Sequence, residues 1–266
     1  MTTIDELLNQ AHDCGTDGQM SVPDSWGQGR TLFGGLSAAL AYRVLRNRIA
    51  DDRVLRNLSV SFVGPIATGQ PFGFEVEILR EGKNVTQALA RITQDGQVAQ
   101  VLLASFGVAR DSSTGVVNDQ KPPFDWPEKP TFLPFIPKVT PQFFQHVDLA
   151  LVDGQFPFTG AKTAHHGGYM RFKDTPETLT DAHLIALIDT WPPTLLQQLK
   201  QPAPASSLAW NMEFLHPHRP VQPDHWFAYH CDTRQAGEGY GHTEANIWDT
   251  HGELVAISRQ TVTVFA

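Results

Sequence analysis

Alternating hydrophobic and polar residues mark two similar stretches of the chain. In the first, Leu58, Val60 and Phe62 alternate with serines, and the second, over residues 208–214, alternates in the same way. A period of two residues is typical of a strand with one buried face. An apolar run with helical character precedes each stretch, over residues 33–45 and 181–191. The pattern therefore predicts two small α+β units in tandem.

Hairpin signals follow the first strand of each unit. They are Gly- and Asn-rich turns at residues 81–84, at Asp95-Gly96 and at residues 237–241. The first helical run carries small residues at Ser37, Ala38, Ala39 and Ala41, which would let that helix lie close against a sheet. One helix followed by several hairpins predicts, in each unit, an antiparallel sheet wrapped around a central helix.

Prolines scattered through residues 109–140 separate the two units. Proline blocks both helices and strand ladders, so we expect a linker over residues 116–140 that crosses a surface, with aromatic residues holding it down. The first unit then covers residues 1–115 and the second covers residues 141–266. We expect the second unit to open with a strand at Phe143–Val152. Its helix begins after Thr180, a suitable N-cap, and ends near Trp191 because two prolines follow.

Composition excludes several classes of function. The 266 residues carry a net charge of −8, which disfavours nucleic acids and anionic membranes as partners. No run of 18 apolar residues occurs, and residues 1–10 lack the basic start of a signal peptide, so we expect a cytoplasmic protein that is not bound to a membrane. Cys14 and Cys231 lie far apart in sequence and are expected to be free thiols.

No sequence motif predicts a metal ion or a cofactor. The histidines, including His165-His166, lack zinc-ligand spacing, and this pair is expected to lie in a solvated turn. The glycines at 237–241 lack nucleotide-loop spacing, and no Gly-x-Ser-x-Gly segment indicates a serine hydrolase.

Four segments resemble the acyl-CoA thioesterase II (TesB-like) family over residues 25–266. They are Phe33-Gly-Gly-Leu36, Ser59–Pro65, the stretch from Asp95 to Phe106, and Asp189-x-Trp-Pro-Pro. The resemblance implies a double hotdog fold, with two helix-filled sheets joined edge to edge, and hydrolysis of acyl-CoA to free acid and CoA. It also implies that homo-oligomers can form through exposed sheet edges.

The resemblance further implies that an Asp, a Ser or Thr, and a Gln hold the water that attacks the thioester. Matched by position, these are Asp189, Ser207 and Gln260, with Ser206 next to the hydroxyl position. In the internal alignment, the first-unit positions that match Gln260 and Asp189 lie near Leu103 and Ala41, so the first unit lacks these polar groups.

The residues themselves give independent support for two of the three. Asp189 follows five apolar residues, where an ionised group is costly unless it has partners, and a negative charge at the end of a helix opposes the helix dipole. Gln260 shares a strand face with small and apolar residues, so its amide also needs partners. The structural alternatives are an aspartate turned to solvent and a glutamine on a strand edge.

Ser207 is harder to place. Strand alternation puts it opposite the apolar set that includes Trp210, so either the strand start bulges or twists, or the hydroxyl lies on the surface. Gly34 and Gly35 allow close packing, or they offer amide donors at a helix N-terminus. Both readings stay open at this stage.

An apolar tunnel lined partly by Leu184, Leu187 and Trp191 would hold the acyl chain. Basic residues would meet the CoA phosphates, and the candidates are Arg30, Arg43, Arg171 and Lys173. Two alternatives remain: a hotdog hydratase or dehydratase of enoyl thioesters, and a non-catalytic acyl-thioester binding protein. The first would require His183 or His216 to approach Asp189.

Overall fold

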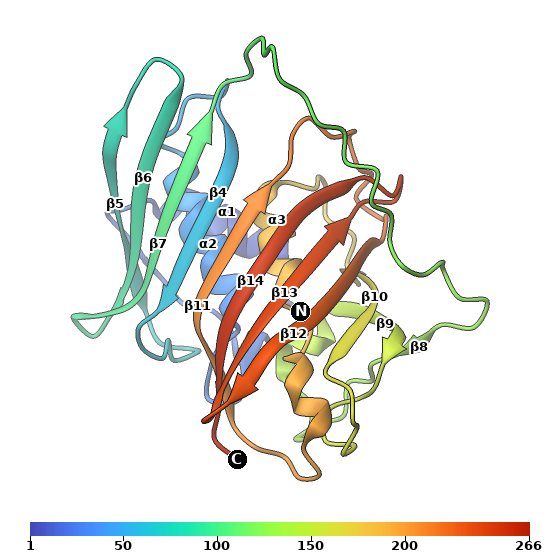
Figure 1. The fold of residues 1–266 in the computed structure, drawn as a ribbon. Coiled ribbons are helices and arrows are strands. Elements are labelled where there is room, and N and C mark those ends of the chain that lie inside the picture. Colours follow the sequence, from blue (N-terminus) through green and yellow to red (C-terminus); the bar gives the residue numbers. More distant parts are fainter.

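A computed structural model describes all 266 residues, which form one large antiparallel sheet curved around helices (Figure 1). Twelve strands make up this sheet. In spatial order they are β1 (Gln19–Met20), β5 (Phe72–Glu81), β6 (Val85–Gln94), β7 (Gln97–Gly107), β4 (Val54–Phe62), β11 (Ala205–Phe214), β14 (Leu254–Val264), β13 (Tyr240–Trp248), β12 (Phe227–Gly237), β10 (His165–Phe172), β9 (Val147–Gly154) and β8 (Thr131–Phe132).

The two predicted units meet where β4 pairs with β11, from Ser61 opposite Ala209 to Asn57 opposite Glu213. Each unit contributes its own central helix, α2 (Gly34–Arg46) in the first and α3 (Asp181–Ile188) in the second. The α+β class and the double hotdog arrangement are therefore confirmed. The remaining helix, α1 (Ile4–Cys14), packs against α2, and short β2 (Gly27–Gln28) and β3 (Thr31–Leu32) form a separate hairpin.

Helices α2 and α3 lie side by side on the inner face of the sheet and run antiparallel. The hydroxyl of Tyr42, near the end of α2, donates to the carboxylate of Asp181 at the start of α3, at 2.9 Å. At the other end, Gly35 in the first turn of α2 abuts Asp189, which caps the end of α3. Between Gly35 and Leu45, every residue of α2 except Arg43 is buried. Both helices therefore belong to one continuous core.

Several local predictions hold. Asp95 and Gly96 both adopt positive φ in the β6–β7 hairpin, as a tight turn of this sequence requires. Thr180 caps α3 in a capping box whose third residue is His183. Both cysteines are free.

Three local predictions were wrong. The strand expected at Phe143–Val152 starts only at Val147, because residues 142–145 form a 3-10 helix that buries Phe143 and Phe144 together. His165 and His166 lie in β10 and not in a solvated turn, and His166 is buried. The proline-rich linker does contribute to the sheet, because Thr131 and Phe132 pair with β9.

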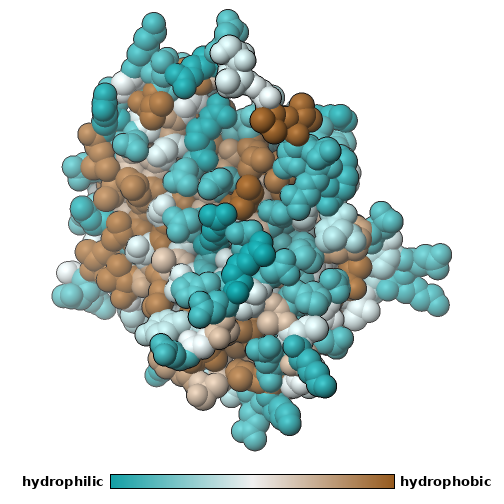
Figure 2. Space-filling model, viewed as in Figure 1, coloured by the Kyte–Doolittle hydropathy of each residue, from teal (hydrophilic) through white to brown (hydrophobic).

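Aromatic residues hold this linker against the outer side of the sheet, as expected. Trp126 packs on Trp226 with ring centroids 4.9 Å apart, and Phe124 packs on Tyr169 at 5.6 Å. The solvent side of the sheet carries mostly hydrophilic side chains at its centre, with more hydrophobic ones toward β5–β7 (Figure 2). None of the three α-helices has the length and hydropathy that a membrane span requires.

Candidate functional site

Asp189, Gln260 and Ser207 form one chain of hydrogen bonds beneath the junction of the two units. The side-chain amide of Gln260 donates to Asp189 Oδ1 at 2.6 Å, and the Ser207 hydroxyl donates to Gln260 Oε1 at 3.3 Å. The three residues come from the end of α3, from β14 and from the start of β11. The structure therefore brings the three sequence candidates together.

A β-bulge explains how Ser207 reaches the inner face. Along β11, Ser207 lies opposite Val262 of β14, and Ala209 lies opposite Thr261, so Leu208 is an extra residue without its own partner. Leu208 is exposed, whereas Ser207 shares the inward direction of Trp210. Ser206 is exposed and bonds only to the backbone of Ser207. The bulge thus selects Ser207 as the hydroxyl in this chain.

The N-terminus of α2 compensates the charge of Asp189. Asp189 caps the end of α3, where the dipole of its own helix is unfavourable for a carboxylate. The backbone N–H of Gly35 donates to this carboxylate, and the positive end of α2 faces it. The Gly35 amide therefore serves Asp189, and the glycine pair also permits close packing of the two helices.

Distances around Gly34 and Gly35 show how closely α2 packs against the end of α3. A Cβ atom there would lie 2.8 Å from Asp189 Cβ and 2.8 Å from the carbonyl oxygen of Ala186. A Cβ at Gly34 would lie 3.0 Å from Asp189 Oδ2 and 3.1 Å from a ring carbon of Phe62. Side chains at either position would push the acid away from α2.

Burial strongly raises the pKa of Asp189. Asp189 keeps part of its surface exposed, but protein atoms surround most of its carboxyl group. Burial raises the pKa of this carboxyl from 3.8 to about 7, while the hydrogen bonds from Gln260 and Gly35 lower it. A carboxylate with a pKa near neutrality can both accept and return a proton at cellular pH. No side chain donates to Asp189 Oδ2, so this oxygen can accept a further hydrogen bond from a ligand.

The other substrate-binding candidates lie in different places. Trp191 is buried two residues beyond Asp189 and stacks on Tyr229, with ring centroids 5.6 Å apart and planes inclined by 6°. Leu184 is buried in the main core, one and a half turns before the acid. Sequence reasoning missed Tyr229, although its alternation with Phe227 and Cys231 on a buried strand face would have placed it inward.

Three of the four basic candidates for the CoA phosphates already have partners. Arg43 donates to Asn47, Arg171 pairs with Asp148, and Lys173 donates to the carbonyl of Phe144. Arg30 has no polar partner in the protein and is exposed in the hairpin that leads into α2. Arg30 therefore remains free to contact a ligand at this end of the site.

Neither His183 nor His216 contacts the carboxyl group of Asp189. His183 Nε2 bonds to Asp5 at 2.8 Å, and its Nδ1 bonds to Thr180 at the start of α3. His216 lies near Asp181, at the end of α3 opposite to Asp189. The Asp/His pair expected of a hydratase is therefore not formed, and nowhere do three His, Cys, Asp or Glu side chains converge in a way that could hold a metal ion.

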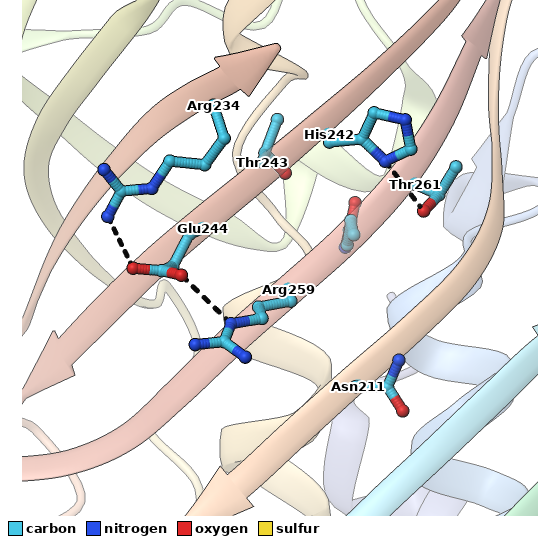
Figure 3. A pocket seen from close by; sticks show the side chains of 8 residues that line it. Asn211, Arg234, His242, Thr243, Glu244, Arg259 and Thr261 are labelled. Atoms are coloured by element: carbon cyan, nitrogen blue, oxygen red, sulfur yellow. Dashed lines mark hydrogen bonds and ion pairs between the residues drawn. The ribbon is translucent and has the colours of Figure 1, made fainter.

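A polar hollow of about 230 Å³ lies over strands β11, β12, β13 and β14 and has no hydrophobic lining residue. Figure 3 shows Arg234 and Arg259 bonded to Glu244 between them, with His242 beside Thr261. Both arginine side chains are more than half exposed. The hollow also includes Gln260, but the Gln260 amide is bonded to Asp189. The single carboxylate of Glu244 pairs with both arginines, and none of these three charged groups contacts the acid.

Comparison with known proteins identifies relatives for both units. The model of the acyl-CoA thioesterase N-terminal domain matches residues 22–107, and that of the acyl-CoA thioesterase C-terminal domain matches residues 117–264. The chain is 22% identical over 254 residues to acyl-CoA thioesterase 2 of Haemophilus influenzae, which covers 87% of this chain and 86% of that protein.

Solved structures share the fold over nearly the whole chain. A hot dog fold protein of unknown function from Alicyclobacillus acidocaldarius has a TM-score of 0.75 and 25% identity, and the match covers 96% of this chain and 98% of that one. Acyl-CoA thioesterase II from Mycobacterium marinum has a TM-score of 0.71 and 21% identity, with 88% and 90% covered. The arrangement of both units is therefore shared with these proteins.

Proposed function

The chain belongs to the acyl-CoA thioesterase family and is a thioester hydrolase, and on that premise we propose that Asp189 activates the water that hydrolyses acyl-CoA. The observation that carries the proposal is the largely buried carboxyl group of Asp189, with Gln260 and Gly35 as donors and a pKa of about 7. An aspartate with its ordinary pKa would be a much weaker base.

The chemistry needs no covalent intermediate. A water beside Asp189 Oδ2 attacks the thioester carbonyl carbon, and its proton passes to the carboxylate. The tetrahedral intermediate then collapses, the C–S bond breaks, and the CoA sulfur leaves with the proton that Asp189 returns. Gln260 and Ser207 fix the orientation of the acid and the water, which is the largest entropic demand of such a reaction. The positive end of the α2 dipole faces the same region and would favour the developing negative charge on the carbonyl oxygen.

In this mechanism CoA lies at the start of α2 and the acyl group extends toward Trp191. Arg30 is exposed near that start and can meet a phosphate. The acyl group instead requires an apolar environment, which the buried ring of Trp191 provides.

Replacing Asp189 by Asn tests the mechanism. Thiol release from acyl-CoA should fall by about 10²–10⁴-fold, the contribution typical of a positioned general base, while acyl-CoA still binds. Asp181→Asn, at the other end of the same helix, serves as the matched control and should retain activity. A variant D189N that keeps more than about a tenth of the activity would exclude Asp189 as the base. A wild-type protein that binds acyl-CoA without turnover would instead indicate a binding protein.

A further inference from the structure

Three aromatic side chains form a compact cluster between the end of α3 and the inner face of β10 and β12. Trp191 and Tyr229 are stacked, and His166 lies 5.1 Å from Trp191 and 6.2 Å from Tyr229 between ring centroids. All three are buried, with exposed fractions of 6%, 7% and 2% for Trp191, Tyr229 and His166. We call these three residues the aromatic cluster.

The hydrogen bonds of a neighbouring glutamine fix the protonation of His166. Gln197 Oε1 accepts from the backbone N–H of Gln155 at 2.9 Å, so the other end of this amide is its nitrogen. That nitrogen donates to the carbonyl of His165 at 2.8 Å and to His166 Nδ1 at 3.3 Å. His166 Nδ1 is therefore an acceptor, and the single proton of the ring lies on Nε2. Burial lowers the pKa of His166 to about 3, so the ring stays neutral.

The cluster contains two buried N–H groups without an acceptor. Neither His166 Nε2 nor Trp191 Nε1 has a hydrogen-bond partner within the protein. Buried donors are nearly always paired in folded proteins, so two unpaired donors on neighbouring rings need an explanation. The cluster is closely packed, because a Cβ at Gly168 would lie only 2.8 Å from the Trp191 ring. The missing Cβ makes room for this indole.

The cluster also adjoins the acid. Trp191 follows Asp189 by two residues, and the negative charge of Asp189 contributes to the raised pKa of the Tyr229 hydroxyl after burial and Cys231. No lysine or arginine bonds to any member of the cluster. A carboxylate would be repelled by Asp189 and would find no cation, whereas a neutral oxygen could accept from both N–H groups.

We propose that His166 and Trp191 donate hydrogen bonds to a neutral oxygen on the acyl group, so that the enzyme prefers acyl-CoA substrates with a hydroxyl or keto group on the chain. The inference rests on the proposed function, because it assumes that the acyl group extends from Asp189 toward Trp191. A plain alkyl chain would leave both donors unpaired, and sites built to bond a polar group discriminate strongly against analogues that lack it.

The test compares hexanoyl-CoA with its 3-hydroxy and 6-hydroxy derivatives, which have nearly equal thioester reactivity. For the wild-type enzyme, kcat/KM for at least one hydroxylated substrate should exceed that for hexanoyl-CoA by tenfold or more. Trp191→Phe and His166→Phe keep an aromatic ring and remove one donor each, so each should reduce this ratio severalfold. His165→Phe is the matched control, because adjacent strand residues point to opposite faces, and it should keep the wild-type ratio.

A merely structural role would lower the rates with all three substrates and leave their ratio unchanged. Equal kcat/KM values in the wild type, or a preference that survives both W191F and H166F, would overturn the inference. Binding to D189N, measured by calorimetry, separates this result from a failure of the proposed function. That variant should still bind the hydroxylated substrate more tightly even where hydrolysis is lost, and equal Kd values there would also overturn the inference.

Discussion

Gln260→Leu should raise the pH at which the enzyme becomes active. Asp189 must be ionised to act as a base, so kcat/KM should rise with pH through the pKa of this carboxyl, about 7 in the wild type. Gln260 donates to the ionised form at 2.6 Å and therefore lowers that pKa. Leucine has a similar size but no donor, and its introduction removes this contribution without opening a large cavity.

The expected shift follows from the strength of one hydrogen bond. A bond to a charged group contributes about 1.5–3 kcal/mol, and one pKa unit corresponds to about 1.36 kcal/mol. The midpoint of the pH profile should therefore move upward by about 1–2 units. Ser207→Ala removes a longer bond, of 3.3 Å, that reaches the acid only through Gln260, so its shift should be smaller.

Thiol release measured between pH 5 and 9.5, with kcat/KM extracted at each pH, provides the assay. Circular dichroism at each pH would show that the variant remains folded over this range. A midpoint in Q260L that stays at the wild-type value, or moves to lower pH, would refute the view that Gln260 stabilises an ionised catalytic carboxylate.

Two further predictions concern stability and can be checked by urea denaturation. Gly35→Ala should lower the free energy of unfolding by about 1–3 kcal/mol and also reduce activity, because its methyl group would overlap the Ala186 carbonyl and Asp189. Gly115→Ala, with no atom within 4 Å of the added methyl, should change the free energy by less than about 0.5 kcal/mol, and equal effects would contradict the packing argument. His183→Ala should cost about 1–3 kcal/mol at pH 8 through loss of the α3 cap and the bond to Asp5. Because burial lowers the pKa of His183, this contribution is present above pH 6.5 and is lost as the pH falls below it, so the deficit of H183A should shrink in acid.

Much of the fold could be predicted because the apolar periods are strong. Leu58, Val60 and Phe62 identify an inward strand face, and the apolar run before Asp189 identifies a buried helix. The same run indicated that Asp189 needs partners, which the structure supplies from Gln260 and Gly35. Periodicity succeeds wherever an element is regular and one face is buried.

The rest of the site could not be predicted from the sequence, because it depends on a strand irregularity and on contacts between residues far apart in the chain. Strict alternation places Ser207 outward, and only the extra residue Leu208 returns it to the inner face. The partner of Asp189 at the start of α2 lies about 150 residues earlier, and a pattern within one unit does not report such a contact. His166 was misjudged because adjacent histidines were read as a turn, whereas burial at His166, Met170 and Phe172 follows a strand.

The apposition of the two central helices makes the halves of the chain interdependent. Gly35 belongs to the N-terminal half and Asp189 to the C-terminal half, so a fragment severed at the linker would leave its acid facing the negative end of α3 alone. The N-terminal half therefore acts as a scaffold whose α2 dipole stabilises the acid of the C-terminal half. The site is complete only when both halves are present.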